Sequence, residues 1–299
     1  MARIAHISDL HIPSPGNWPW SDMVFNKRIT GAANLLTFRN DAHPFAACEE
    51  LIADLNAHSV DHVILTGDLT NLSLEEEFER AHALLTKLGD GRKLSLVPGN
   101  HDKYVTSSVR EGRFESWFGQ WMHADGDENP DYPYTKSIAE GVQFLGLCSA
   151  IPTPPFMSWG RLGSDQLERL IARAEAIDAR RNFTIAAVHH NLHPRSSARK
   201  DWSTMLKDRD AFVDALFTAG IDLVLHGHTH EAHRMRIQRG DQSVSVVGCG
   251  SSTWNSPTHP ARYNVYTIAD GALEAIHCRI RRSAERGFEA EASPLAIES

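Results

Sequence analysis

Five short motifs whose side chains can ligate metal ions are spread along this chain, and each follows a short apolar run. The motifs are Asp9-x-His11, Gly67-Asp68, Gly99-Asn100-His101-Asp102, His189-His190 and Gly227-His228-Thr229-His230. The runs before them are rich in Val, Ile or Leu, which is typical of buried strands. We therefore expect carboxylate, amide and imidazole groups to converge at the ends of several strands.

The spacing within the motifs indicates how ions could be held. A pair of divalent ions needs oxygen donors and imidazoles, together with one carboxylate that contacts both ions, and Asp68 is suited to that position. Asp9 and His11 are separated by one residue. At an extended strand end their side chains would point the same way and could chelate one ion. The same geometry applies to His228 and His230.

Three glycines each directly precede a candidate ligand: Gly67, Gly99 and Gly227. We expect them to form sharp turns with backbone dihedral angles that only glycine tolerates. Such turns would let the backbone approach the ions closely.

The apolar pattern predicts an α/β chain. Up to about residue 219, predicted strands alternate with predicted helices, which favours βαβ units. The predicted strands are residues 3–7, 62–66, 93–97, 142–148 and 183–188, and the predicted helices are residues 44–57, 74–88, 164–176 and 208–219. Consecutive strands then follow at 223–226, 232–238, 243–248, 262–269 and 272–281, with turns at Gly240-Asp241 and Asp270-Gly271. This second part predicts a separate sheet of antiparallel hairpins.

Two segments fall outside this pattern. Residues 12–43 are too many for an ordinary strand-to-helix connection, and we interpret them as a flap over the metal-ligand motifs. Residues 282–299 mix charged residues with Ala, Pro and Ser without a period, so we expect a flexible tail. The expected domain therefore spans residues 1–281 as one unit, with the flap inserted near its start.

Composition excludes several classes of protein. The chain carries 30 Lys+Arg and 38 Asp+Glu, a net charge of −8, which argues against a nucleic-acid backbone as its main partner. Its four cysteines show no Cys-x-x-Cys spacing, so we expect neither a zinc knuckle nor a disulfide framework. No apolar run approaches the ~20 residues of a membrane span. A removable signal would take Asp9 with it, so we expect a cytoplasmic protein, and a homo-oligomer is compatible with the sequence.

The order and spacing of the five motifs resemble the calcineurin-like metallophosphoesterase superfamily over about residues 3–250. The resemblance implies an α/β fold in which two mixed β-sheets pack as a sandwich flanked by helices. It also implies that the ligands lie on loops at the sheet ends and that a water or hydroxide joins two divalent metal ions. Mixed oxygen and imidazole ligands accept Mn²⁺, Fe²⁺/Fe³⁺ or Zn²⁺.

The resemblance also assigns roles by motif position. It places Asp9, His11 and His230 on the first metal, Asn100, His189 and His228 on the second, and Asp68 on both. His190 competes with His189, because a strand alternates its side chains, and the family pattern favours His189. His101 would contact the scissile phosphate and protonate the leaving oxygen, and Asp102 would orient His101 through a hydrogen bond.

The activity that this implies is hydrolysis of a phosphodiester by attack of a metal-bridging hydroxide on phosphorus. The expected substrate is a small-molecule phosphoester, such as a cyclic nucleotide, a glycerophosphodiester or a phospholipid headgroup. The alternatives within the superfamily are a phosphomonoesterase and a nucleotide-sugar lipid pyrophosphatase. A different class is a metal-bound scaffold that has lost turnover and binds a partner through the flap.

Three residues outside the motifs are candidates for substrate binding. Trp18 in the flap could shape an apolar pocket, or it could only anchor the flap. Arg28 could hold a second phosphate or an acidic headgroup, although a solvated surface role is common for a single arginine. Arg195 lies in the Ser-rich stretch 193–200, which we interpret as a mobile loop at the rim of the site.

Overall fold

The structure is a computed structural model. It describes residues 1–14, 27–29, 31, 42–123, 131–195, 197–256 and 258–295.

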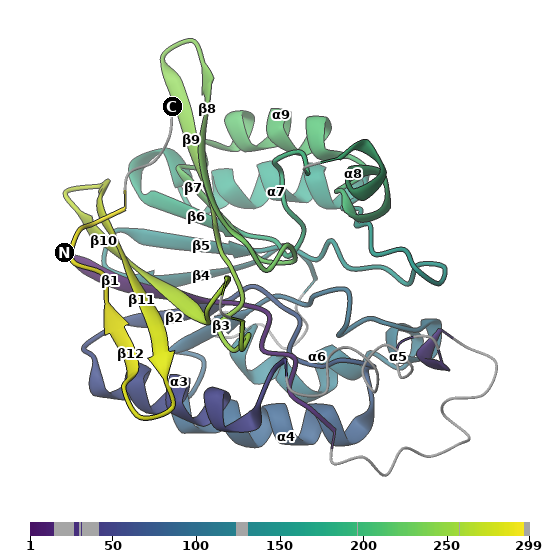
Figure 1. The fold of residues 1–299 in the computed structure, drawn as a ribbon. Helices are drawn as coiled ribbons and strands as arrows, with labels where there is room; N and C mark the ends of the chain where they lie inside the picture. The colour runs from purple at the N-terminus through teal and green to yellow at the C-terminus, as the bar shows by residue number, and fades with distance from the viewer. Residues whose placement is uncertain are drawn as a thin grey trace.

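Two mixed β-sheets of six strands each form the centre of the molecule. The first has the strand order β12-β11-β10-β1-β2-β3 and the second the order β4-β5-β6-β7-β9-β8. The strands are β1 (Ala2–Ile7), β2 (His62–Leu65), β3 (Leu94–Leu96), β4 (Tyr134–Ala139), β5 (Val142–Gly146), β6 (Phe183–Ala187), β7 (Leu223–His226), β8 (Ala232–Arg239), β9 (Gln242–Cys249), β10 (Arg262–Ala269), β11 (Ala272–Ser283) and β12 (Gly287–Ala290). The expected sandwich of two mixed sheets in a single domain is confirmed (Figure 1).

Helices cover the outer faces of both sheets, with α3 and α4 beside the first sheet and α7 and α9 beside the second (Figure 1). The helices are α3 (Phe45–Ala57), α4 (Glu75–Leu85), α5 (Thr106–Arg110), α6 (Arg113–Phe118), α7 (Ser164–Ala176), α8 (Ala198–Thr204) and α9 (Arg209–Ala219), with 3₁₀ turns η2 (Thr86–Leu88), η3 (Gly119–Trp121) and η4 (Ala179–Arg181). The larger helices bury one apolar stripe, as in α3 with Cys48, Leu51, Ile52 and Leu55. None of the described helices is long and apolar enough to cross a membrane.

The main core fills the space between the two sheets. It joins Leu65 and Leu96 of the first sheet with Ile185 and Leu225 of the second, all fully buried. A second core packs α7 and α9 against the other face of the second sheet. The main core fixes the two sheets relative to each other, and with them the loops that leave the strand ends.

The strands after Leu223 do not form a sheet of their own, and that expectation was wrong. β7 pairs in parallel with β6, and β9 pairs in parallel with β7. β10 pairs antiparallel with β1 at the other end of the chain. Periodicity identifies a strand but not its partner, which explains the error. The two-residue turns are confirmed, because Gly240-Asp241 joins β8 to β9 and Asp270-Gly271 joins β10 to β11.

Part of the segment expected as a flexible tail is a strand. β11 continues to Ser283, and β12 pairs antiparallel with it. Phe288 is the apolar residue that fixes β12, because its ring packs 5.6 Å from the ring of Tyr263. One buried side chain in four residues leaves no period for a sequence pattern to detect.

Candidate metal centre

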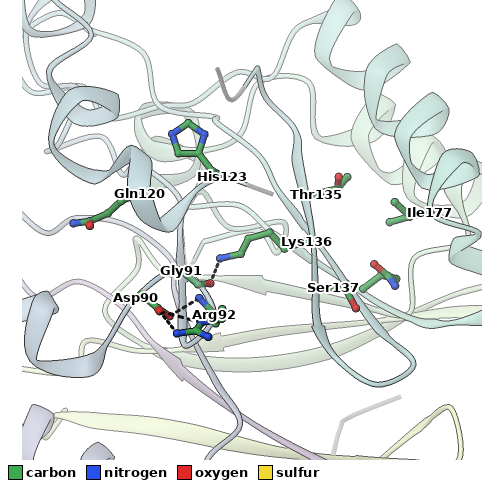
Figure 2. Close-up of a pocket in the computed structure, with 10 residues that line it drawn as sticks. Asp90, Gly91, Arg92, Gln120, His123, Thr135, Lys136, Ser137 and Ile177 are labelled. Carbon is green, nitrogen blue, oxygen red and sulfur yellow. Dashed lines mark hydrogen bonds and ion pairs between the residues drawn. The ribbon is translucent and has the colours of Figure 1, made fainter. Parts of the chain in front are cut away.

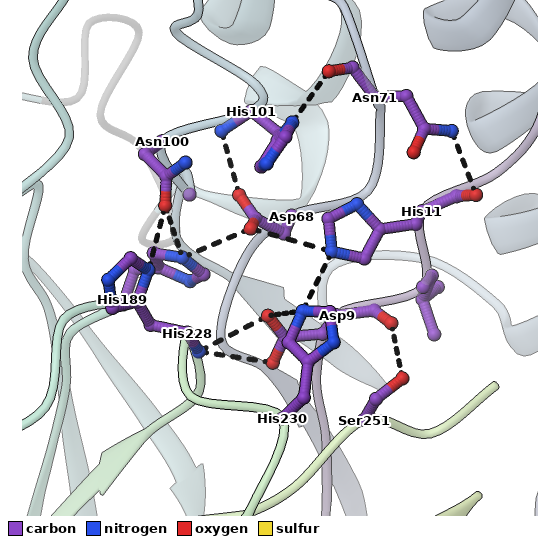
Figure 3. Close-up of polar contacts among 12 residues, drawn as sticks. Asp9, His11, Asp68, Asn71, Asn100, His101, His189, His228, His230 and Ser251 are labelled. Atoms are coloured by element: carbon purple, nitrogen blue, oxygen red, sulfur yellow. Dashed lines mark hydrogen bonds and ion pairs between the residues drawn. The ribbon is translucent and has the colours of Figure 1, made fainter. Parts of the chain in front are cut away.

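The loops after β1, β2, β3, β6 and β7 meet at one place, and these are the loops that carry the five motifs. Figure 3 shows their side chains pointing toward one another. Two of the strands belong to the second sheet and three to the first. The cluster therefore joins the two halves of the sandwich.

A first group of donors consists of Asp9, His11, Asp68 and His230, whose ligand atoms lie within 4.8 Å of one another. The Nε2 atoms of His11 and His230 are 3.0 Å apart. His11 Nε2 lies 3.6 Å from Asp68 Oδ2, and His230 Nε2 lies 3.4 Å from Asp9 Oδ1. Two atoms that each bind one ion at about 2.1 Å lie roughly 3.0–3.4 Å apart, so this spacing fits ligands around a shared cation.

A second group consists of Asp68, Asn100, His189 and His228. His189 Nε2 lies 3.3 Å from Asp68 Oδ2 and 3.1 Å from Asn100 Oδ1. His228 Nδ1 lies 2.8 Å from the same Asn100 oxygen. The single oxygen Asp68 Oδ2 thus faces imidazoles of both groups, which is the geometry that a carboxylate shared by two ions requires.

Hydrogen bonds to backbone carbonyls fix which nitrogen of each ring faces the cluster. His189 Nδ1–H donates to Thr66 O at 2.7 Å, and His228 Nε2–H donates to Thr204 O at 3.1 Å. The opposite nitrogen of each ring then carries a lone pair directed at the cluster, as in protein metal sites. The Thr204 carbonyl belongs to α8, whose first residues lie in the stretch 193–200 that we expected to be a mobile loop.

The electrostatics of the cluster follow from burial. Burial lowers the pKa of His11 and His228 well below the ordinary value. Burial also acts to lower the pKa of His189, but the charge and hydrogen bond of Asp68 outweigh it and raise that pKa to about 9. Burial would raise the pKa of Asp68, yet the neighbouring histidines hold it well below its usual range. The neutral imidazoles of His11 and His228, beside the Asp68 carboxylate, are suited to receive cations.

Most of the clustered residues adopt left-handed backbone conformations. Their φ values are 54° at Asp9, 44° at His11, 56° at Asp68, 69° at His228 and 57° at His230. The interpretation that Asp9 and His11 chelate from an extended strand end was therefore wrong. The strands end before these residues, and tight turns bring the side chains together instead.

Two different reasons explain why glycine precedes the ligands. Gly67 has a φ of 90°, as expected. Gly99 and Gly227 do not have positive φ, so the dihedral argument was wrong for them. A Cβ at Gly99 would lie 2.1 Å from Asp68 Oδ1, and one at Gly227 would lie 1.9 Å from Ser8 Oγ. Close approach to the ligand loops is what excludes a side chain there.

His101 borders both groups. Its backbone N–H donates to Asp68 Oδ1 at 2.8 Å, and its ring Nδ1–H donates to Asn71 O at 2.6 Å. The ring stacks on Tyr104 with centroids 5.3 Å apart and meets the His11 ring edge-on at 4.9 Å. The ring is therefore held beside the cluster from several sides.

The Asp102 carboxylate, which we expected to orient His101, binds the backbone of the two ligand loops. It accepts backbone N–H bonds from Asp68, Leu69, Thr70 and Gly99 at 2.8–2.9 Å. The left-handed turn at Asp68 leaves these amides unpaired, and the buried carboxylate satisfies them. Burial raises the pKa of Asp102 to about 7, and the charge of Asp68 adds to the effect.

His189 belongs to the second donor group, whereas the ring of His190 packs 4.5 Å from the ring of His228 and bonds serine residues outside the group. His190 Nδ1 lies 2.7 Å from Ser149 Oγ, and its Nε2–H donates to Ser158 O at 3.0 Å. Burial lowers the pKa of His190 to about 3. Of the two adjacent histidines, His189 is the one with a ring nitrogen within 4.8 Å of ligand atoms of Asp68 and His228.

Comparison with known proteins decides the family. The family model described as calcineurin-like phosphoesterase matches residues 2–232. The chain belongs to this family.

The relatives agree with the membership. Purple acid phosphatase 22 of Arabidopsis thaliana is 23% identical over 192 residues, which cover 62% of this chain and 41% of that protein. The chain thus spans about two fifths of that relative's length. A dimetal phosphatase from Danio rerio has a TM-score of 0.59 at 14% identity, covering 93% of this chain and 95% of its own. A purple acid phosphatase from yellow lupin (Lupinus luteus) has a TM-score of 0.60 at 13% identity, covering 96% and 52%. The last two likenesses show a shared fold.

In this phosphoesterase-family chain the three residues predicted to bind substrate lie in different environments. Arg28 is buried, and its guanidinium donates to Leu72 O at 2.8 Å and Ser73 O at 2.7 Å, which holds the loop after Asp68. Arg195 is mostly buried, with its guanidinium 4.0 Å from the carboxylate of Glu231. Trp18 lies outside the described residues.

Sequence reasoning missed two residues beside the cluster. Lys27 Nζ donates to Thr153 Oγ1 and to Met157 O, both at 2.7 Å, and lies 4.6 Å above the ring of Tyr104. Burial lowers the pKa of Lys27 to about 8, although the charge of Asp68 opposes the shift. His43 lies against the first donor group. Neither residue belongs to a motif, so only their position in the fold reveals them.

A cavity of about 610 Å³ lies elsewhere, between the start of β3 and the hairpin β4–β5, and is lined by residues that include Arg92, His123 and Lys136 (Figure 2). It shares no residue with the metal-ligand cluster. Lys136 Nζ donates to Leu94 O at 2.9 Å and to Trp121 O at 3.1 Å. Its ammonium group therefore stabilises the backbone there.

Proposed function

We propose that this chain is a dinuclear metal-dependent phosphodiesterase. In this proposal the first ion is held by Asp9, His11 and His230, the second by Asn100, His189 and His228, and both by Asp68. The observation that carries the proposal is the position of Asp68 Oδ2, 3.6 Å from His11 Nε2 and 3.3 Å from His189 Nε2. A buried carboxylate that binds no ion would not require imidazoles on two sides.

When bound, two such ions would lower the pKa of a shared water toward ~7 and neutralise charge on the phosphate. The protein must then supply the proton that the leaving alkoxide of a diester needs. His101 is suited to supply it. Its Nδ1–H is given to Asn71 O, so Nε2 is the nitrogen that can carry a proton to the leaving oxygen.

Charge supports a diester over a monoester. A phosphomonoester carries a second negative charge that the protein must neutralise, whereas a diester carries one. Arg28 already donates to two backbone carbonyls, and Arg195 lies near Glu231. Lys27 lies over the ring of Tyr104, which stacks on His101, and it likewise donates to two protein oxygens. All three cations thus already have protein partners, which favours a substrate with a single negative charge. Small diesters such as cyclic nucleotides, glycerophosphodiesters or phospholipid headgroups fit this charge.

The second candidate is a phosphomonoesterase, which the phosphatase relatives favour. One assay separates the two. The protein is stripped of metal, restored with Mn²⁺, Fe²⁺ or Zn²⁺, and assayed with bis(p-nitrophenyl) phosphate and with p-nitrophenyl phosphate. Faster hydrolysis of the diester supports the proposal. Faster hydrolysis of the monoester favours the second candidate, and no hydrolysis with any of these metals contradicts both.

A further inference from the structure

A third imidazole adjoins the first donor group. His43 is 6% exposed, and its ring centroid lies 4.7 Å from that of His11 and 5.5 Å from that of His230. One ring nitrogen from each of these histidines lies within 4.8 Å of the others. Three imidazoles that face one another at this distance form a group of nitrogen donors that could hold an ion.

The hydrogen bonds of His43 indicate which nitrogen is available. Thr253 Oγ1 donates to Leu10 O at 2.9 Å, so its oxygen is left to accept from His43 Nδ1–H, also at 2.9 Å. With the proton on Nδ1, the lone pair is on Nε2. His189 and His228 are arranged in the same way, with one nitrogen donating to an oxygen and the other facing the cluster.

The backbone holds His43 firmly at this point. The carbonyl of Ala42 accepts from Asn255 N at 2.7 Å, and α3 begins directly after Pro44. The same loop from residue 251 supports Asp9, because Ser251 Oγ donates to Asp9 O at 2.8 Å. His43 and Asp9 are thus positioned by one common element.

We propose that His43 is an additional ligand of the first metal ion and binds it through Nε2. This inference rests on the proposed metal ligation. The first ion would then contact three imidazoles, from His11, His43 and His230, whereas the second contacts two imidazoles and an amide oxygen. Nitrogen ligands favour Zn²⁺ and Co²⁺ over Mn²⁺, so the first site should prefer those ions more strongly than the second.

Titration of the metal-stripped protein with Co²⁺ tests this without any assay of activity. Binding is followed by the visible absorption of Co²⁺, which reports its ligands, and by the number of ions bound at equilibrium. We expect His43→Ala to weaken one of two sites at least about 10-fold and to change the spectrum of that ion. Added imidazole should restore the affinity of that site and the spectrum of its ion. His259→Ala is the matched control, because His259 is exposed and stacks on Trp254.

A second variant guards against a folding defect. Thr253→Val keeps His43 but removes the acceptor of its Nδ1–H, together with the hydroxyl's bonds to Leu10 O and Asp9 O, and it should weaken the same site. Two unchanged Co²⁺ sites and an unchanged spectrum in His43→Ala would overturn the inference, as would a loss of affinity that imidazole does not restore. Failure of the wild-type protein to bind two ions would instead overturn the proposed function on which the inference rests.

Discussion

Several residues of the cluster adopt backbone conformations that are uncommon for a residue with a Cβ. A left-handed conformation costs roughly 1–2 kcal/mol for a residue with a Cβ, and Asp9, His11 and Asp68 all adopt it. Hydrogen bonds compensate locally, as from Asp9 N to Gly67 O at 3.0 Å and from His11 N to Asp68 O at 2.9 Å. Strain of this kind is typical of functional sites.

Gly227→Ala should weaken metal binding, because its Cβ would meet Ser8 Oγ at 1.9 Å and Asp9 Oδ2 at 2.5 Å. The new methyl group has to displace Asp9 from the position shown in Figure 3. Equilibrium dialysis of the stripped protein with Co²⁺ measures the loss. Gly119→Ala is the control, because the nearest atom to its Cβ is the ring end of His123 at 3.3 Å. Equal affinity in both variants would show that the close approach at Gly227 is unimportant.

His101→Ala should leave both ions bound and reduce turnover by about 10²–10⁴-fold, which is the usual contribution of a general acid. The loss should be smaller for a diester with a good leaving group such as p-nitrophenolate, which hardly needs protonation. Parallel assays with an alkyl and a nitrophenyl diester measure this difference. An equal loss for both substrates would argue for a role of His101 other than protonation.

His62 should make the protein sensitive to acid. It is buried in β2, where its ring lies 2.9 Å from Arg92 O and 2.8 Å from Ser95 Oγ, and burial lowers its pKa from 6.5 to about 3. The unfolded chain binds this proton and the folded chain does not. The stabilisation is therefore complete above pH 6.5 and decreases as the pH falls toward 3.

His62→Gln removes that titration. Between pH 8 and pH 5 the wild-type free energy of unfolding should fall by about 2 kcal/mol more than that of the variant, at about 1.4 kcal/mol per pH unit below 6.5. Urea unfolding at the two pH values, with EDTA present, measures the difference. The prediction fails if both proteins lose the same free energy.

At the scale of elements, the loop after β2 depends on Asp102. The carboxylate accepts four backbone amides from two loops and the hydroxyl of Thr70 at 3.1 Å. It therefore ties the Asp68 loop to the Asn100 loop. These hydrogen bonds indicate that Asp102 positions both ligand loops.

Asp102→Asn should therefore impair metal binding as well as turnover. The amide group presents one acceptor oxygen in place of two, so some of these N–H groups lose their partner, at a cost of about 1–3 kcal/mol each. Thermal unfolding and Co²⁺ titration both report the change. His101→Ala is the comparison, because it should keep the thermal stability and the Co²⁺ affinity of the wild-type protein. Intact metal affinity in Asp102→Asn would mean that the loops hold their shape without it.

The sequence was most informative where an element carries a strong pattern. Four-residue β2 is buried throughout, and α7 buries Leu167, Leu170 and Ala174 at helical spacing. β4 was missed because its residues alternate only weakly between buried and exposed. His43 was missed for a different reason, since its neighbours come from distant parts of the chain.

For the whole molecule, the cluster draws ligands from both sheets (Figure 1). Asp9, Asp68 and Asn100 follow strands of the first sheet, and His189 and His228 follow strands of the second. The motifs revealed which residues converge. They did not reveal that the last strands divide between the two sheets, because pairing depends on contacts that are remote in sequence.

Metal ions that join the two sheets should stabilise the folded protein. At a concentration 100 times the Kd, a bound ligand adds about 2.7 kcal/mol, which corresponds to roughly 5–10 °C in Tm for a chain of this size. Differential scanning calorimetry of the stripped protein, with and without added ions, measures the shift. The same Tm in both conditions would indicate that the cluster does not bind ions in the folded state.

The central claim is that two ions act together at Asp68. The most direct test titrates the stripped protein with the metal that gives the highest rate, while bound metal and diester hydrolysis are measured on the same samples. We predict that hydrolysis reaches its plateau at two bound ions per chain and that Asp68→Asn impairs both binding steps. A plateau at one ion, or hydrolysis that persists in the stripped protein, would contradict the account.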